Sequence, residues 1–276
     1  KNLNYKWTSF KELACALICI PNNNNNHRDE AMALDTANTA FLAQLADQGV
    51  KPFHLTQPDE ARGLMVGLRE TIGAGPQMYR VEETILGQGS QRFRVRVLFP
   101  SATPQGVIIH YHGGGWVLMT IDDYDTLGRF IAEETGCCVV LVEYRLAPEH
   151  RYPAAVEDAW LALNWAADQS EALTGVIGAP LIVSGDSAGG NLAAVVAQRA
   201  ARVGAPLLAQ QVLIYPVTQP DLNTPGYLDP ANQGMLSQAD MVWFWDHYLP
   251  DATLRLEKDA SPLLAESLHG LPPTVL

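Results

Sequence analysis

The sequence is poor in cysteine, in positive charge and in long hydrophobic runs. Four cysteines in 276 residues are too few for the dense disulfide framework of a small secreted domain. Eighteen Lys and Arg stand against thirty Asp and Glu, and this net charge of −12 argues against a nucleic-acid partner. The apolar run at residues 13–20 has eight residues, whereas a membrane-spanning helix needs about twenty. We therefore expect a soluble globular protein without a membrane span, with the cytoplasm as its default location.

The chain is long and apolar enough to bury a substantial core. With 47% hydrophobic residues and a prior of roughly 150 residues per domain, it can form one large domain or two small ones. Residues 1–31, which begin with Lys rather than Met, precede the first strongly patterned segment, so we expect an appendage there and a single domain over 32–276. Cys137 and Cys138 lie in an apolar run and are expected to be core thiols, and Cys15 and Cys19 have no second pair at metal-binding spacing. No metal or cofactor is expected.

The apolar periodicity changes along the chain. Helical spacing predicts helices over 36–48 and 58–72. Basic and apolar residues alternate strictly over 92–97, which predicts a half-buried strand with a solvated face rather than an anion site, paired with an antiparallel strand at 79–86. From residue 107 onward, continuous apolar strands alternate with helices, which predicts an α/β fold with a mostly parallel sheet and helices on both faces. The strands are expected at 107–111, 138–142, 181–184 and 211–214, and the helices at 123–134, 153–168, 188–202 and 237–248. Chemistry in such sheets gathers at the carboxyl ends of the strands.

A G-x-S-x-G motif follows the strand expected at 181–184. Gly185-Asp-Ser-Ala-Gly189 lies between this strand and a helix of small residues, which is the context that a nucleophile elbow requires. The turn strains the nucleophile, and its flanking glycines permit close backbone approach. At a helix N-terminus, whose partial positive charge favours a developing oxyanion, Ser187 is the expected nucleophile.

Three consecutive glycines follow the strand expected at 107–111, in His112-Gly-Gly-Gly-Trp116. Such a run costs backbone entropy that Ala would save, so something must approach this backbone closely. Beside a nucleophile elbow, the amides of Gly113, Gly114 and Ala188 are the expected oxyanion-hole donors, and a flexible turn is the alternative interpretation. Trp116 is a candidate for the wall of the substrate pocket, although an aromatic side chain more often belongs to the core.

Three stretches of this sequence together resemble the hormone-sensitive-lipase-like esterases, also called bacterial esterase family IV, of the α/β-hydrolase fold. They are the glycine stretch 112–116, Tyr-Arg-Leu-Ala-Pro-Glu-His-Arg-Tyr-Pro-Ala-Ala at 144–155, and Gly-Asp-Ser-Ala-Gly-Gly-Asn at 185–191, in the family's order. The resemblance extends over roughly 33–276. It implies an N-terminal cap of helices at about 33–75, completed by residues 221–248, over the acyl site. It also implies the nucleophile Ser187, the oxyanion donors Gly113, Gly114 and Ala188, a glycine loop held by His112, and a structural role for 144–155.

The acid and the base of a catalytic triad do not lie where the family places them. In this fold they follow the nucleophile in the order Ser, Asp or Glu, His, and the chain stops within the strand after which the Asp is expected. We therefore expect both residues beyond Leu276, the last strands and helices to be missing, and the chain as given to be nearly inactive. Weaker alternatives are Asp221 as an acid placed one strand early and His247, His269, His110 or His112 as the base.

The expected function is that of a serine carboxylesterase that hydrolyses short or medium acyl esters through an acyl-enzyme on Ser187. Its expected partner is a small-molecule ester, with no nucleic acid, and a homodimer is left open. Two alternatives use the same fold: a non-catalytic protein whose pocket binds a small molecule, and an amidase or lactonase with the same triad.

Overall fold

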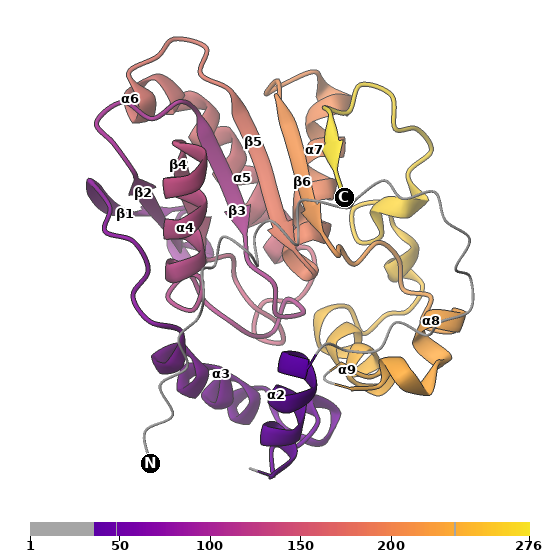
Figure 1. The fold of residues 1–276 in the computed structure, drawn as a ribbon. Coiled ribbons are helices and arrows are strands. Elements are labelled where there is room, and N and C mark those ends of the chain that lie inside the picture. The colour runs from indigo at the N-terminus through magenta and orange to yellow at the C-terminus, as the bar shows by residue number, and fades with distance from the viewer. Residues whose placement is uncertain (1–35, 48, 235) are drawn as a thin grey trace, which may run out of the picture. The chain divides into compact units, whose positions relative to one another are not determined.

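The computed structural model describes residues 36–47, 49–234 and 236–276 (Figure 1). Helix α2 (Thr36–Asp47) confirms the helix predicted at 36–48, belongs to a first unit that ends at residue 48, and is described by itself. All other described elements belong to a second unit that begins at Gly49. The predicted appendage 1–31, with Cys15 and Cys19, lies outside the described residues.

A sheet of seven strands, counted over the described residues, organises the second unit. The strands are β1 (Arg80–Leu86), β2 (Phe93–Phe99), β3 (Val107–Tyr111), β4 (Cys138–Val142), β5 (Leu181–Asp186), β6 (Gln210–Ile214) and β7 (Thr274–Val275). Their order across the sheet is β1-β2-β4-β3-β5-β6-β7. Strands β3 to β7 run parallel, whereas β2 is antiparallel to both β1 and β4. The mostly parallel sheet and the predicted β1–β2 pair are thus confirmed, and the antiparallel contact of β2 with β4 is an additional finding.

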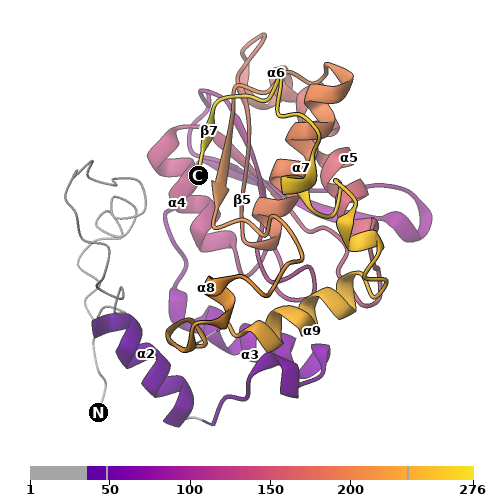
Figure 2. The same cartoon turned by 90° about the vertical axis from the view of Figure 1, so that its right-hand side faces the viewer.

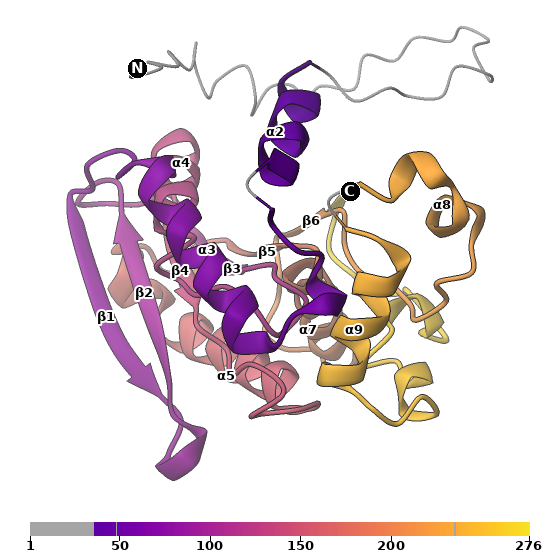
Figure 3. The same ribbon diagram turned by 90° about the horizontal axis from the view of Figure 1, so that it is seen from below.

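Helices cover both faces of this sheet, as predicted. Helix α4 (Asp125–Thr135) packs on one face against β2 and β4, and α5 (Ala154–Asp168), α6 (Ser170–Thr174) and α7 (Ala188–Val203) pack on the other (Figures 1 and 3). Two apolar clusters result because neighbouring residues of a strand point to opposite faces. Ile109 belongs to the larger cluster beneath α5 and α7, whereas Ile108 belongs to the smaller cluster beneath α4. Cys137 and Cys138 are buried and unpaired, as expected of core thiols.

Carboxylates surround the arginines of strand β2. Arg94 donates to Glu143 at 2.6 Å and to Asp122 at 3.0 Å, and Arg96 contacts Asp125 at 2.9 Å and also Glu83 and Asp122. The apolar residues of the strand are buried on its other face. The prediction of a half-buried strand is therefore confirmed, and since both guanidinium groups are already paired with carboxylates, these two arginines do not form an anion site.

Helices α3 (Pro58–Ile72) and α9 (Gln238–Tyr248) lie beyond the carboxyl ends of the parallel strands (Figures 1 and 2). Helix α3 has the predicted bounds, with Pro58 at its start and two acids in its first turn. The 3₁₀ turn η1 (Phe53–Leu55) before α3 is joined to α9, since the backbone amide of His54 donates to the Asp240 carboxylate at 2.9 Å. The predicted loop 221–234 contains only the short helix α8 (Pro225–Leu228) and one 3₁₀ turn, Pro230–Asn232, among its described residues.

Candidate active site

The register of the sheet brings the two glycine-rich motifs together. Strands β3 and β5 are parallel neighbours, and Tyr111 at the end of β3 pairs with Gly185 near the end of β5. The glycine loop, which we define as residues 112–116, and the nucleophile elbow, residues 185–189, therefore leave the sheet side by side although about 70 residues separate them in sequence. This is the carboxyl edge where parallel sheets build their sites.

The elbow has the strained backbone that its motif predicts. Ser187 has φ 53° and ψ −117°, a conformation that costs energy for a residue with a Cβ, and α7 begins at the next residue. Its amide donates to the carbonyl of Ile214 at 2.9 Å, and its carbonyl accepts from the amide of Val217 at 3.1 Å. A Cβ on Gly185 would overlap the carbonyl of Gly189, and a Cβ on Gly189 would overlap that of Tyr111. Both glycines of the motif are thus required by close backbone approach.

Each glycine of the glycine loop is required by a different neighbour. A Cβ on Gly113 would overlap the Asp186 carboxylate, one on Gly114 the carbonyl of Leu118, and one on Gly115 the ring of Phe244. Gly114 and Gly115 also have φ of 102° and 60°, which favour glycine. The interpretation of a flexible turn is therefore wrong, because this loop is closely packed on several sides.

The carboxylate of Asp186 joins the elbow to the glycine loop. Its Oδ1 accepts from the amide of Gly113 at 3.1 Å, and its Oδ2 accepts from the hydroxyl of Tyr124 at 2.7 Å. The same hydroxyl accepts from the amide of Gly113 at 3.0 Å. Burial raises the pKa of Asp186 to about 6, because the hydrogen bonds to the carboxylate offset only part of the desolvation.

The structure gives the amide of Gly113 a role other than the expected one. Its single hydrogen is already shared by Asp186 and Tyr124, so the expectation that Gly113 donates to an oxyanion is corrected. The amides of Gly114, Gly115 and Ala188 donate to no acceptor within the part of the chain that the structure describes. Gly115, for which the motif predicted no donor role, thus joins Gly114 and Ala188 as a candidate donor.

His112 is the first residue of the glycine loop, and its side chain folds back onto the loop in a position suited to hold it. Its Nδ1 lies 2.7 Å from the carbonyl oxygen of Gly113, and its ring stacks on Tyr144 at 4.3 Å between centroids. The hydroxyl of Tyr144 donates to the carbonyl of His112 at 2.8 Å. Burial lowers the pKa of His112 to about 4 and that of His110 to about 3, so both rings are neutral at pH 7.

No base contacts Ser187, the expected nucleophile, among the described residues. The Oγ of Ser187 has no hydrogen-bond partner there, and the Nδ1 of His110 lies 3.3 Å from Ser184 instead. His247 packs its ring edge-on against Trp243 on α9, and His269 is exposed. Asp221 is exposed and accepts from the amide of Asn223, as expected of a loop residue. None of these residues completes a triad in the geometry described.

Trp116 belongs to the core. Its side chain is 0% exposed, and its ring stacks on Tyr248 at 4.2 Å and tilts against Trp245 at 4.9 Å. The expectation that Trp116 lines the substrate pocket is therefore corrected, because the ring packs in an aromatic cluster beneath α9. Trp245 is equally buried, and Trp243, half-buried, donates its indole N–H to the carbonyl of Thr56.

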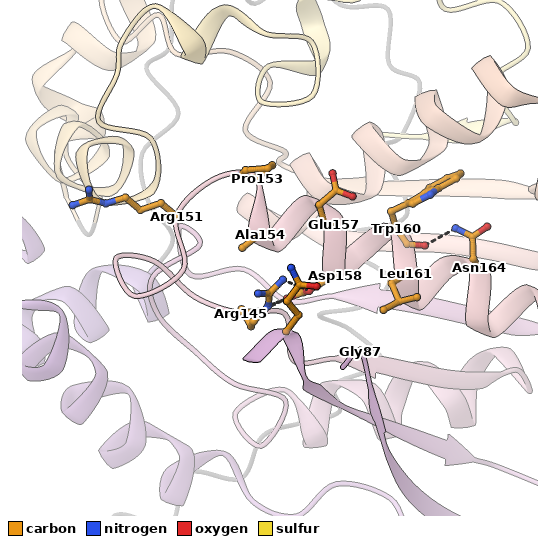
Figure 4. A pocket seen from close by; sticks show the side chains of 11 residues that line it. Gly87, Arg145, Arg151, Pro153, Ala154, Glu157, Asp158, Trp160, Leu161 and Asn164 are labelled. Carbon is orange, nitrogen blue, oxygen red and sulfur yellow. Dashed lines mark hydrogen bonds and ion pairs between the residues drawn. The ribbon is translucent and has the colours of Figure 1, made fainter. Parts of the chain in front are cut away.

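One cavity lies away from the elbow, and none of its lining residues belongs to residues 185–189. Its volume is about 640 Å³, and it opens between the β1–β2 turn and the start of α5 (Figure 4). Arg145 and Asp158, paired at 2.8 Å, lie within it, with Trp160 and Leu161 on the helix side. Large cavities often mark sites, but this one holds none of the strained backbone or free amides found beside Ser187, and we therefore base the function on the elbow.

None of the helices described is both long and apolar enough to cross a membrane. The described histidines, cysteines and carboxylates likewise form no group of three or more that could bind a metal ion.

Known proteins match the chain over most of its length. Residues 108–276 match the model of a family described by the α/β-hydrolase fold. Carboxylesterase NlhH of Mycobacterium tuberculosis is 38% identical over 203 residues, which are 71% of this chain and 63% of NlhH. Esterase LipI of the same organism is 34% identical over 259 residues, 91% of this chain and 78% of LipI.

Solved structures agree with these sequence matches. A hyperthermophilic esterase from the archaeon Pyrobaculum calidifontis superposes with a TM-score of 0.80 at 35% identity, covering 88% of this chain and 79% of that one. A thermostable esterase from Pseudomonas putida gives 0.79 at 34% identity, covering 89% and 78%. The chain belongs to the α/β-hydrolase fold family, among its hormone-sensitive-lipase-like carboxylesterases.

Proposed function

We propose that the protein is a serine carboxylesterase that cleaves short or medium acyl esters through an acyl-enzyme on Ser187. The observation that carries this proposal is the strained elbow beside a loop with free amides. The backbone of Ser187 at φ 53° and the unpartnered amides of Gly114, Gly115 and Ala188 belong to neighbouring strand ends. The names of the relatives, carboxylesterase and esterase, support the same reaction class.

In the proposed reaction, Oγ of Ser187 attacks the carbonyl carbon of the ester, and its proton passes to a base. The carbonyl oxygen becomes an oxyanion, which accepts hydrogen bonds from the amides of Gly114, Gly115 and Ala188. The carbon–oxygen bond to the alcohol then breaks, and the alcohol leaves with the proton. Water, deprotonated by the same base, then attacks the acyl-enzyme; the bond between the acyl carbon and Oγ breaks, the proton passes from the base to Oγ, and the carboxylic acid leaves.

The proposal needs a base that the described residues do not include. Ser hydroxyls are weak nucleophiles at neutral pH, and no described histidine contacts Ser187. We assign that role to a histidine outside the described residues, preceded by an acid, in the chain order Ser, acid, His of this fold. The chain spans 63% of the length of NlhH, so the activity is proposed for the full-length protein.

Hydrolysis of p-nitrophenyl butyrate by the full-length protein tests the proposal. We expect turnover that is lost in Ser187→Ala, since the acyl-enzyme cannot form without Oγ. The matched control is Ser184→Ala, which removes a buried hydroxyl from the preceding strand, near His110. Wild-type turnover that persists in Ser187→Ala would overturn the proposal. A wild-type protein that binds the ester without turnover would favour the non-catalytic alternative. Faster hydrolysis of p-nitrobutyranilide than of the ester would indicate an amidase, and faster hydrolysis of γ-butyrolactone would indicate a lactonase.

A further inference from the structure

We propose that Asp186 and Tyr124 form a positioning pair that fixes the glycine loop for oxyanion stabilisation, a role that rests on the proposed function of Ser187. The pair joins three segments of the chain. Asp186 directly precedes the nucleophile, Tyr124 directly precedes helix α4, and both contact the amide of Gly113 in the glycine loop. Neither side chain forms a hydrogen bond with Ser187 in the part of the chain that the structure describes.

The hydrogen bonds of the pair form a closed ring of three groups. The Gly113 amide donates to Oδ1 of Asp186 and to Oη of Tyr124, and Oη donates to Oδ2 of Asp186. The residue of the elbow that accepts these hydrogen bonds, Asp186, is therefore the sequence neighbour of Ser187. Any shift of the glycine loop relative to Ser187 must lengthen at least one of these three contacts, so the ring fixes the distance on which an oxyanion hole depends.

The burial of Asp186 indicates a purpose beyond folding. The residue is 7% exposed, and no Lys or Arg pairs with it in the part of the chain that the structure describes. The imidazole of His110 is also close, with Nε2 3.8 Å from Oδ1, but burial lowers the pKa of His110 and keeps this ring neutral. A buried carboxylate without a cation costs free energy that a neutral side chain would save. A carboxylate does, however, provide two acceptor oxygens, one for the amide of Gly113 and one for the hydroxyl of Tyr124.

The free amides lie next to the amide that the pair holds. Gly114 and Gly115 follow Gly113 directly, and Phe244 and Leu118 confine them from the other side. If the hydrogen bonds to the Gly113 amide are lost, the segment of Gly114 and Gly115 is no longer held at its N-terminal end, and their positive φ angles can change. Their amides then turn away from the oxyanion in part of the population, and the loss falls on the transition state rather than on substrate binding.

Two substitutions in the full-length protein test the pair. Tyr124→Phe deletes the hydroxyl and leaves the carboxylate to accept from Gly113, and we expect kcat for p-nitrophenyl butyrate to fall about tenfold with KM within about twofold. Asp186→Asn replaces one acceptor oxygen by a donor, and we expect a fall of about a hundredfold. The double variant should lose less than the product of the two factors, because both residues serve one network.

A transition-state analogue provides the readout that a merely structural role would not change. A trifluoromethyl ketone adds Oγ and carries an oxyanion, so its inhibition constant should rise by the same factor as kcat falls, while inhibition by butyrate stays constant. The matched controls are Tyr152→Phe, whose hydroxyl donates to Glu257 at 2.8 Å, and Asp158→Asn, whose carboxylate pairs with Arg145. Both are expected to keep kcat within about twofold of the wild type, since neither touches the glycine loop.

Hydrogen exchange of the peptide that contains residues 110–118 gives a test without turnover. We expect Tyr124→Phe to speed exchange of this peptide about tenfold and Tyr152→Phe to leave it unchanged. If Asp186→Asn does not fold, the same measurements on Tyr124→Phe alone test the positioning role. If kcat and the inhibition constant of the ketone stay within about twofold in the folded variants, the positioning role is overturned, whatever their melting temperatures. Activity that persists in Ser187→Ala would overturn the proposed function. The hydrogen-exchange measurement would then still test whether Tyr124 holds the glycine loop, because it does not depend on turnover.

Discussion

The nucleophile elbow and the glycine loop both use a rare backbone conformation, but they are held in different ways. The elbow is held by backbone: the amide of Ser187 donates to Ile214, and the two motif glycines contact carbonyls. The glycine loop is held by side chains from outside the loop: Asp186 and Phe244, which are distant in sequence, and Tyr124, which is 11 residues from Gly113. A strained turn held by its own backbone can be recognised, together with its contacts, from a short motif. For a turn held by side chains from elsewhere, the motif identifies the turn but not the residues that hold it.

The largest effect is expected for Gly189→Ala in the elbow. The new Cβ would overlap the carbonyl of Tyr111, and neither the end of β3 nor the start of α7 can move away without breaking the sheet edge. We expect a loss of more than about 3 kcal/mol in the free energy of unfolding, measured with urea. Gly190→Ala, whose Cβ would lie 3.0 Å from Cβ of Pro216, is the milder neighbour. Equal stability of both variants would contradict a backbone-held elbow.

Gly115→Ala tests the side-chain-held loop. Its Cβ would overlap the ring of Phe244, and its φ of 60° is unfavourable for alanine, so we expect a loss of about 2–3 kcal/mol in the free energy of unfolding. Addition of Phe244→Leu should restore part of that loss, since it removes the overlap and leaves the backbone strain. A double variant no more stable than Gly115→Ala would show that Phe244 does not confine the loop.

The pH dependence of stability separates Asp186 from its neighbours. Its pKa is raised to about 6, so between pH 6 and about 4 the folded state binds a proton that the unfolded state lacks, and its contribution to stability grows as the pH falls. His110 and His112, with lowered pKa values, act oppositely: their contribution is present above about 6.5 and is lost as the pH falls toward 4.

The difference between the wild type and Asp186→Asn isolates the carboxyl, because both proteins share the histidines. We expect this difference in unfolding free energy to shift by about 2 kcal/mol in favour of the wild type between pH 7 and pH 4, measured by urea unfolding at each pH. The groups that surround Asp186 are His110, Tyr124, Tyr144 and Tyr215, and the tyrosines stay neutral over this range because their pKa values are raised. A difference that does not change with pH would contradict the raised pKa.

The smallest effect, of opposite sign, is expected for a glycine that no contact requires. Gly63 lies exposed within α3, and a Cβ there would meet no heavy atom within 4 Å. Gly63→Ala should therefore stabilise the protein by about 0.5–1 kcal/mol through the helix propensity of alanine. Thermal unfolding measures this gain, and destabilisation would reveal a contact of Gly63 that this geometry lacks.

Sequence patterns predicted the elements of the fold well because most of the information is local. Strands β3 and β4 and helix α3 have the predicted bounds, since continuous apolar runs and capping residues mark them directly. The pairing of β2 with β4 was not predicted. Alternation identifies which face of β2 is buried, but nothing in the strand itself specifies which neighbour forms the second ladder.

The site was predictable where residues act through their own backbone. The elbow at Ser187 and the packing of the glycine loop followed from the glycine spacing. The roles expected for Gly113 and Trp116 were wrong because they depend on side chains outside the glycine loop: Asp186 and Tyr124 for the amide, Tyr248 for the indole ring. Asp186 stood within the motif as the residue before Ser187, and its charge in a segment expected to be buried was the signal that could have revealed its role.

The paired arginines of β2 have a consequence for the response of the protein to ionic strength. Arg94 and Arg96 are surrounded by carboxylates of Glu83, Asp122, Asp125 and Glu143, within a chain whose net charge is −12. Added salt screens the attraction within this cluster and, at the same time, the mutual repulsion of the excess acids elsewhere on the chain. The two effects on stability have opposite signs. The cluster therefore stabilises the fold most in dilute buffer, which is also where repulsion among the excess acids destabilises it most.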